Sequence, residues 1–258
     1  MAKKVKGTVD IVVLMDITGS MQTCIDAVKQ SVSTFVNSMT TKDANNSAPI
    51  QDWRLKVVGY RDYDKDPGTW FVDNPFVRDV AAVQAQLAAP NMQAEGGGDE
   101  PESLLDAIYK VSTMGEAGIQ DGEDPNRWRT RGSCARALIF FTDATFRRTM
   151  SLPEAAGGGI GDVIAKISSS KIILCGFQPE WEGYNELGTA DKATLVTVAK
   201  LSDTPALAGL GKPGPEGIAA QVAAVNAMSA KASDATAFTK IMEQLAKTVV
   251  KSVTVEVA

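Results

Sequence analysis

Three oxygen-bearing side chains stand at alternate positions where the first apolar run of the chain ends. Residues 9–15 lead into Asp16, and Thr18 and Ser20 follow it at the second and fourth positions. A strand that ends there places one carboxylate and two hydroxyls at one edge of a sheet. All three are hard oxygen ligands of the kind that Mg²⁺, Mn²⁺ and Ca²⁺ accept. An isolated motif of this kind also fits a structural role, in which a hydroxyl caps the following helix and Asp16 faces its positive end.

Two further acidic segments are expected at the same edge. Asp143 follows the apolar run 137–142, and the acidic residues 99–102 follow three glycines and precede a helical pattern. Three acidic termini brought together would repel one another unless a cation compensated their charge. The sequence therefore predicts a divalent-metal site, with Mg²⁺ as the expected ion and Mn²⁺ or Ca²⁺ as alternatives.

The elements that must position these groups alternate between apolar runs and helical patterns. Residues 55–60 and 172–177 resemble the two runs above, because they are nearly continuous in apolar residues, as buried parallel strands are. Apolar residues with helical spacing lie between and after these runs: Ile25, Val28, Val32, Phe35 and Met39, then Leu104, Ile108 and Val111, then Phe238, Ile241, Met242, Leu245 and Val249. This alternation predicts an α/β fold with a doubly wound, mostly parallel sheet flanked by helices, which binds ligands at its carboxyl edge.

The remaining segments are interpreted as rims and an extension of one domain that covers residues 1–258. Residues 69–77 predict a short antiparallel edge hairpin with a proline at its turn. Residues 203–217 contain three prolines and four glycines, too many for a helix or a central strand, and two helical segments follow them. Residues 253–257 alternate strictly, which predicts an edge strand or a frayed tail. The core is expected at residues 8–200.

Composition excludes several chemistries. The chain has no histidine, which removes Ser-His-Asp and Cys-His catalysis and histidine-ligated zinc. A formal net charge of -5 leaves no broad basic surface for nucleic acid. No apolar run approaches the roughly 18 residues of a membrane span. The three cysteines form no paired motif, which fits a reducing compartment, and Cys24 is interpreted as a packing residue rather than a reactive thiol. These features predict a cytoplasmic protein that binds neither nucleic acid nor membrane.

Taken together, the acidic motifs resemble the von Willebrand factor A (VWA) domain family. Residues 16–20 are similar to the Asp-x-Ser/Thr-x-Ser signature of the family, and residues 96–102 and 141–144 follow in the family's order and spacing. Residues 59–63, Gly-Tyr-Arg-Asp-Tyr, also recur in intracellular and bacterial-type members. The resemblance spans residues 8–200. It implies a metal-ion-dependent adhesion site (MIDAS) whose open coordination position takes an acidic side chain from a partner protein, and it implies a binding protein rather than an enzyme.

The resemblance assigns ligands by position, with one departure. Asp16, Thr18 and Ser20 match the signature loop, and Asp143 matches the late aspartate. The threonine that the family usually supplies between them has no counterpart, since residues 86–104 contain no threonine. This stretch looks more like the integrin β-subunit variant, in which the glutamate after proline is the ligand. The resemblance therefore implies Glu102 first and Asp99 second. The extra negative charge is expected to tighten cation binding and to lower the attraction for a partner carboxylate.

The loops after the strands are expected to surround the contact with the partner. Arg147, Arg148, Trp181 and Tyr184 lie in two of these loops, and Trp, Tyr and Arg are favoured interface residues. Ordinary packing of the aromatic residues and solvation of the arginines is the alternative. The expected partner is a protein that offers Asp or Glu. By analogy with the family it is an AAA+ ATPase or a kinase or phosphatase module in a larger bacterial-type assembly.

Two other functions stay open at this point. A Mg²⁺-dependent phosphohydrolase with Asp16 as nucleophile would resemble haloacid dehalogenase-type phosphatases, which need a second aspartate where Thr18 stands. The other is a scaffold whose metal is purely structural. Residues 209–214 match the dinucleotide pattern Gly-x-Gly-x-x-Gly, but Pro213 and Pro215 remove amide donors that a pyrophosphate would need.

Overall fold

The computed structural model describes residues 7–41, 50–96, 101–118 and 123–253. Within these ranges six strands form one sheet in the order β3-β2-β1-β4-β5-β6. Their bounds are β1 Thr8–Asp16, β2 Asp52–Tyr60, β3 Phe71–Asp73, β4 Ala135–Phe141, β5 Ile172–Pro179 and β6 Thr194–Ala199. Every neighbouring pair is parallel except β2 and β3. The predicted doubly wound α/β fold is confirmed, and the four predicted strands correspond to β1, β2, β4 and β5.

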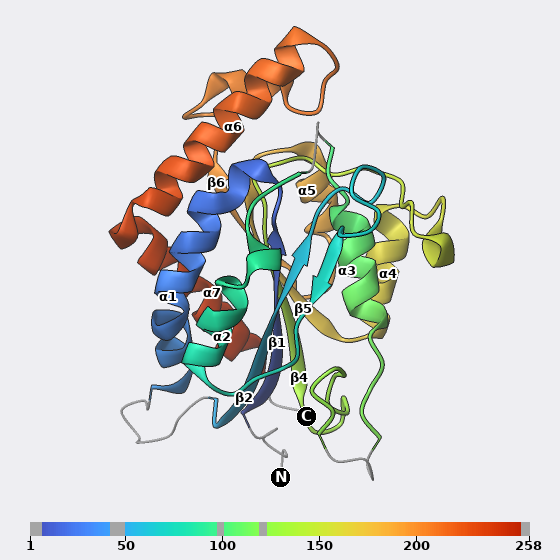
Figure 1. Cartoon of the computed structure of the whole chain (residues 1–258), viewed down its shortest axis with the longest axis vertical. Helices are drawn as coiled ribbons and strands as arrows, with labels where there is room; N and C mark the ends of the chain where they lie inside the picture. The colour runs from blue at the N-terminus through green and yellow to red at the C-terminus, as the bar shows by residue number, and fades with distance from the viewer. Residues whose placement is uncertain (1–6, 42–49, 97–100, 119–122, 254–258) are drawn as a thin grey trace.

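Helices cover both faces of the sheet (Figure 1). On one face lie α1 (Gln22–Thr40), α2 (Val80–Leu87), α6 (Pro215–Ser233) and α7 (Ala235–Val253), and on the other lie α3 (Leu104–Thr113), α4 (Ile160–Ser169) and α5 (Glu182–Leu187). Central strand β1 is apolar toward both layers, since Ile11 and Val13 pack in the first and Val12 and Leu14 in the second. This two-sided burial explains why the apolar runs are continuous rather than alternating.

The two edges of the sheet differ from the prediction. Residues 69–77 do not form a self-contained hairpin, because β3 pairs with the end of β2 while Val77 pairs with Leu55 further back on the same strand. At the opposite edge, β6 is a strand that the sequence analysis did not predict. It pairs in parallel with β5, and its side chains are mostly half-buried. β3 and Val77 at one edge, and β6 at the other, bond backbone N–H and C=O groups of β2 and β5 that would otherwise lack a partner strand.

The C-terminal part adds the two predicted helices. α7 packs along α1 and buries Phe238, Met242 and Leu245, as its apolar spacing predicts. α7 continues to Val253, so the first residue of the strand or tail predicted for residues 253–257 is helical. The rest of that segment lies outside the described residues. None of the described helices has both the length and the apolar character needed to span a bilayer.

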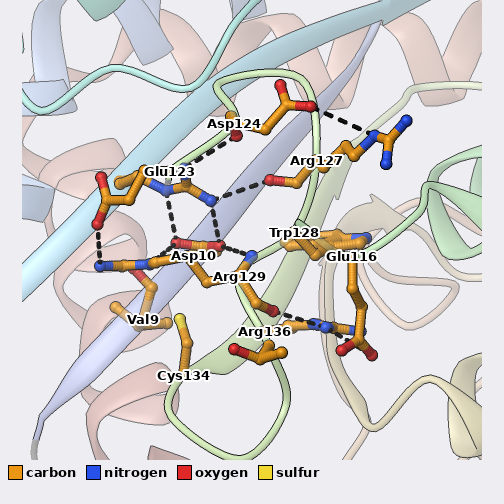
Figure 2. Close-up of polar contacts among 12 residues, drawn as sticks. Val9, Asp10, Glu116, Glu123, Asp124, Arg127, Trp128, Arg129, Cys134 and Arg136 are labelled. Carbon is orange, nitrogen blue, oxygen red and sulfur yellow. Dashed lines mark hydrogen bonds and ion pairs between the residues drawn. The ribbon is translucent and has the colours of Figure 1, made fainter. Parts of the chain in front are cut away.

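A buried ion-pair cluster closes the amino edge of the sheet (Figure 2). Asp10, near the start of β1, is fully buried, and its carboxylate accepts hydrogen bonds from Nε and Nη2 of Arg54 at 3.0 and 2.7 Å. It also accepts from Nε and the backbone N–H of Arg129, both at 2.8 Å. Arg54 in turn donates to the carbonyls of Asp124 and Arg127 at 3.1 and 3.0 Å. The cluster therefore fastens the loop before β4 to β1 and β2.

The three cysteines lie inside this fold. Cys24, Cys134 and Cys175 are all buried and form no disulfide, and burial is the main reason that the pKa of each thiol is raised, to about 12 for Cys134 and Cys175. Because the thiolate is the reactive form, we expect a disulfide reagent such as dithionitrobenzoate at pH 8 to modify the native protein far more slowly than the guanidinium-unfolded protein, in which three thiols should titrate. Rapid reaction of Cys24 in the native protein would contradict its place in the core.

Candidate functional site

The end of β1 and the end of β4 lie side by side, as the two acidic motifs require. β1 and β4 pair in parallel over Val9 to Met15, so Asp16 and the residues that follow β4 leave the sheet at the same edge. One carboxylate oxygen of Asp16 accepts hydrogen bonds from the backbone N–H and the hydroxyl of Thr18 at 3.0 and 2.7 Å. The other accepts the hydroxyl of Thr142 at 2.7 Å. Asp16 thus links the two loops from inside the sheet.

Asp16 is more deeply enclosed than the sequence indicates. Its side chain is fully buried, and this burial raises its pKa, an effect that the hydrogen bonds from Thr18 and Thr142 counter. Thr142 is a residue that the sequence analysis passed over as a contributor to the site. Its position directly before Asp143 was the only available signal.

A second contact joins the same loops nearer to solvent. The hydroxyl of Ser20 donates to Asp143 Oδ1 at 3.0 Å, across 123 positions of sequence. Ser20 is exposed, whereas Asp143 is buried. Both residues line a cavity of about 290 Å³ together with Thr18 and Glu102. Four of the predicted ligand residues therefore face one cavity. Asp16 does not line it but accepts the hydrogen bonds that hold Thr18 in place.

The predicted acidic residue from the intermediate loop is also held at this cavity. The backbone N–H of Glu102 donates to the carbonyl of Thr145, and the N–H of Arg147 donates to the carbonyl of Glu102, both at 2.9 Å. This short parallel bridge fastens Glu102, which is 4% exposed, to the loop after β4. Asp99, the second choice, lies outside the described residues.

Arg61, in the Gly-Tyr-Arg-Asp-Tyr stretch, anchors the loop on the other side of the cavity. Its buried guanidinium donates to the carbonyls of Thr69, Gln93 and Glu95 at 3.0, 3.2 and 2.9 Å. Three carbonyls are satisfied by one side chain, which holds the approach to Gly96 in place. The carbonyl of Gly96 then accepts the N–H of Gly19 at 3.4 Å, within the signature loop. Residues 59–63 thus have a positioning role here.

Helix α6 forms the far wall of the cavity, which the sequence analysis did not predict. Gln221, Val222, Val225 and Asn226 of α6 line it, and Figure 1 shows α6 at the same end of the molecule as the start of α1. The bulky apolar residues of α6 show little helical periodicity toward the core, so the sequence offered no signal for this placement.

The four predicted partner-contact residues have different environments. Arg148 is exposed, pairs with Glu182 and Glu186, and its guanidinium lies 5.2 Å from the centre of the half-buried Trp181 ring. The side chain of Arg147 is 19% exposed and pairs with Asp62 and Asp64.

Tyr184 corrects the expectation of an exposed anchor. It is 2% exposed, and its hydroxyl donates to the carbonyl of Ala144 next to Asp143. Its ring also packs edge-on against Phe146, with centroids 5.2 Å apart. Tyr184 is buried because α5, which follows β5, packs against the loop after β4. It braces the cavity from within and is not available to a partner.

The donor set at this edge consists of oxygen atoms. Thr18 and Ser20 contribute hydroxyls, and Glu102 and Asp143 contribute carboxylates, a combination that suits Mg²⁺, Mn²⁺ or Ca²⁺ rather than softer metals. In the part of the chain that the structure describes, no group of three or more His, Cys, Asp or Glu side chains is arranged to hold a metal ion. A cation here would therefore depend on the two hydroxyls as well as on the carboxylates.

Fold and site together define a doubly wound α/β domain with an oxygen-lined cavity at its topological switch point.

No protein-family model and no curated protein matches the sequence. Among solved structures, the pilus adhesin SpaC from Lactobacillus rhamnosus GG, in its open conformation, aligns with a TM-score of 0.50 and 12% identity over 97% of this chain and 31% of the adhesin. Proximal thread matrix protein 1 from the mussel byssus aligns with a TM-score of 0.45 and 12% identity over 76% of this chain and 45% of its own. The chain thus spans less than half of either protein, and at these identities the adhesin shows a shared fold alone.

Proposed function

We propose that this chain is a VWA-like interaction domain that binds a divalent cation at the carboxyl edge of β1 and β4 and, through it, an acidic side chain of another protein. The observation that carries the proposal is the hydrogen bond between Ser20 and Asp143 at the mouth of an oxygen-lined cavity. It joins the signature loop to the late aspartate, as a shared cation would require. The resemblance of the three acidic motifs to the VWA family supports the same reading.

The residues have distinct parts in this proposal. Thr18, Ser20, Glu102 and Asp143 would hold the cation directly or through water, and Asp16 would fix Thr18. When bound, Mg²⁺ keeps exchangeable waters, and an outside carboxylate can replace one of them to form a charge-assisted contact. Mn²⁺ or Ca²⁺ would serve the same chemistry. The partner class, an AAA+ ATPase or a kinase or phosphatase module, and the cytoplasmic setting stay predictions from sequence.

The environment of Asp16 argues against the phosphohydrolase alternative. A nucleophilic carboxylate must reach its substrate, and in the described structure both oxygens of Asp16 accept hydrogen bonds while the side chain is fully buried. Thr18 occupies the position where a second aspartate would protonate the leaving group. A purely structural metal is less well supported, because the candidate ligands face a cavity that opens to solvent through Ser20.

Calorimetric titration with MgCl₂ and MnCl₂ tests the cation site. We expect Asp143→Ala to lose affinity on the order of 100-fold, since a first ligand contributes at least as much as the outer-shell groups whose loss costs 10–100-fold. The matched control is Asp26→Ala, which removes an exposed aspartate of α1 that touches only Gln22 among its described contacts. Equal cation affinity in Asp143→Ala and in the wild type would refute the assignment.

A further inference from the structure

The cavity lined by Thr18, Ser20, Glu102 and Asp143 is called the cation cavity. A second, larger cavity lies beside it. It has a volume of about 860 Å³ and is formed by the loops after β4 and β5 on one side and by the start of α6 with the segment before it on the other. Gln221 lines both cavities, so the two lie next to each other. The larger cavity is called the α6 groove below. Its volume is in the range of about 300–1,000 Å³ that is typical of ligand pockets.

Two bulky apolar side chains near the start of α6, Ile218 and Val222, are exposed to solvent. Among the described residues, the exposed large hydrophobic side chains are Leu201, Ile218 and Val222, which are 41%, 64% and 54% exposed. Leu201 and Ile218 line the α6 groove, and Val222 lines the cation cavity. All three therefore line one or other of two neighbouring cavities, and apolar surface that is exposed at a cavity is typical of interaction sites.

The first two turns of α6 bury small residues and expose large apolar ones. In the first half of the helix the buried positions are held by the small residues Gly217, Ala220 and Ala224, and Met228 is buried further along, whereas Ile218 and Val222, one turn apart, are exposed. Gly217 is required where it stands, because a Cβ there would lie 1.7 Å from the carbonyl oxygen of Lys212. The first turn of α6 is therefore fixed close to the preceding loop, with its large apolar residues on the open side.

The opposite wall of the groove is held in place by contacts among its own side chains. Arg148 pairs with Glu182 and Glu186 and lies over Trp181. Trp181 packs edge-on against Phe146, with ring centroids 4.9 Å apart. A segment that enters the groove does not have to order this wall, which lowers the entropic cost of binding.

We propose that the cation cavity and the α6 groove form one docking surface for a partner segment that carries a carboxylate with a bulky apolar side chain close to it. The inference rests on the proposed function, because the carboxylate is the group that the cation would take. The apolar side chain is argued from adjacency: Gln221 lines both cavities, the exposed Ile218 lines the α6 groove, and the exposed Val222 lines the cation cavity. The Gln221 amide can both donate to and accept from the backbone of a segment that crosses there.

Selection from a random peptide display library tests this surface. The library is bound to the wild-type protein in Mg²⁺ and eluted with EDTA, and we expect the enriched peptides to share Asp or Glu with a nearby Leu, Ile or Phe. A synthetic peptide of the enriched sequence should then lose about tenfold or more in affinity for Ile218→Asp, a position that lines only the α6 groove. Ala219→Asp is the matched control, because Ala219 is exposed on the same helix but lines neither cavity.

The outcomes separate the two proposals. Mg²⁺ affinity, measured by calorimetry, should be unchanged in Ile218→Asp and lost in Asp143→Ala, whereas peptide binding should weaken in both. Enriched peptides with an acidic residue and no apolar preference, or full peptide affinity in Ile218→Asp, would overturn the groove and leave the cation site standing. Binding that resists EDTA, or no enrichment at all, would count against both. Self-association of the wild type that Ile218→Asp abolishes would show that a second copy covers the groove, which also overturns the inference.

Discussion

Replacement of Asp10 by alanine is expected to destabilise the fold by about 3–5 kcal/mol, the loss typical when one partner of a buried ion pair is removed. Arg54 and Arg129 are 2% and 8% exposed, and the Asp10 carboxylate accepts four hydrogen bonds from them. Without it, Arg54 loses the one carboxylate with which it pairs among the described residues, and Arg129 keeps only Asp52 and Glu123, which are 41% and 42% exposed. The loop before β4 should loosen together with the amino ends of β1 and β2.

Urea unfolding followed by circular dichroism measures this effect. The control is Arg78→Ala, which breaks ion pairs with Asp52 and Glu123 whose members are 41–49% exposed, and which should cost no more than about 1 kcal/mol. Asp10→Asn keeps an acceptor oxygen and should fall between the two. A change below about 1 kcal/mol in Asp10→Ala would mean that the cluster contributes no more than surface pairs do.

Replacement of Asp16 by asparagine should separate stability from cation binding. The cation-free protein is expected to be as stable as the wild type or more stable, because burial opposes the charged form of this carboxylate, as its raised pKa indicates. Asparagine can still accept from Thr18, and its amide can donate to the hydroxyl of Thr142. Affinity for Mg²⁺ should nevertheless fall by about 10–100-fold, since the negative charge behind Thr18 is gone.

Two measurements on one variant decide this prediction. Urea unfolding in EDTA gives the stability of the cation-free protein, and calorimetric titration gives the Mg²⁺ affinity. Loss of stability with unchanged Mg²⁺ affinity would assign Asp16 a structural role alone, as an acceptor for the helix-side loop. Asp26→Ala again serves as the exposed control. The more drastic Asp16→Ala should also abolish Mg²⁺ and Mn²⁺ binding, but it leaves Thr18 and Thr142 without an acceptor.

Part of the site was predictable because it depends on local pattern and on topology. A continuous apolar run that ends in Asp, Thr and Ser at alternate positions places those residues at the carboxyl end of a parallel strand. The run before Asp143 does the same for the next strand. Parallel strands that share an edge then bring their following loops together, which is why Ser20 and Asp143 meet.

Three features that the sequence did not predict correctly, the burial of Tyr184, strand β6 and the position of α6, depend on contacts between distant segments. Whether Tyr184 is exposed or buried depends on how α5 packs onto the loop that contains Ala144, and the sequence of α5 alone does not encode its distance from that loop. β6 is short and half-buried, so its apolar pattern is weak. The wall that α6 adds to the cation cavity depends on close packing of small residues, which carry almost no periodic signal.

The sequence by itself determined the class of fold, the parallel strands at its centre and the edge at which Asp16, Thr18, Ser20, Asp143 and the acidic segment 99–102 had to be sought. These features follow from residue type and from spacing over a few residues. Only the tertiary structure decided that Asp16 is sealed behind the cavity, that Tyr184 is inside, and that Ile218 and Val222 are exposed beside the site. Burial is a property of surfaces that meet from distant parts of the chain, and local pattern does not contain the partner surface.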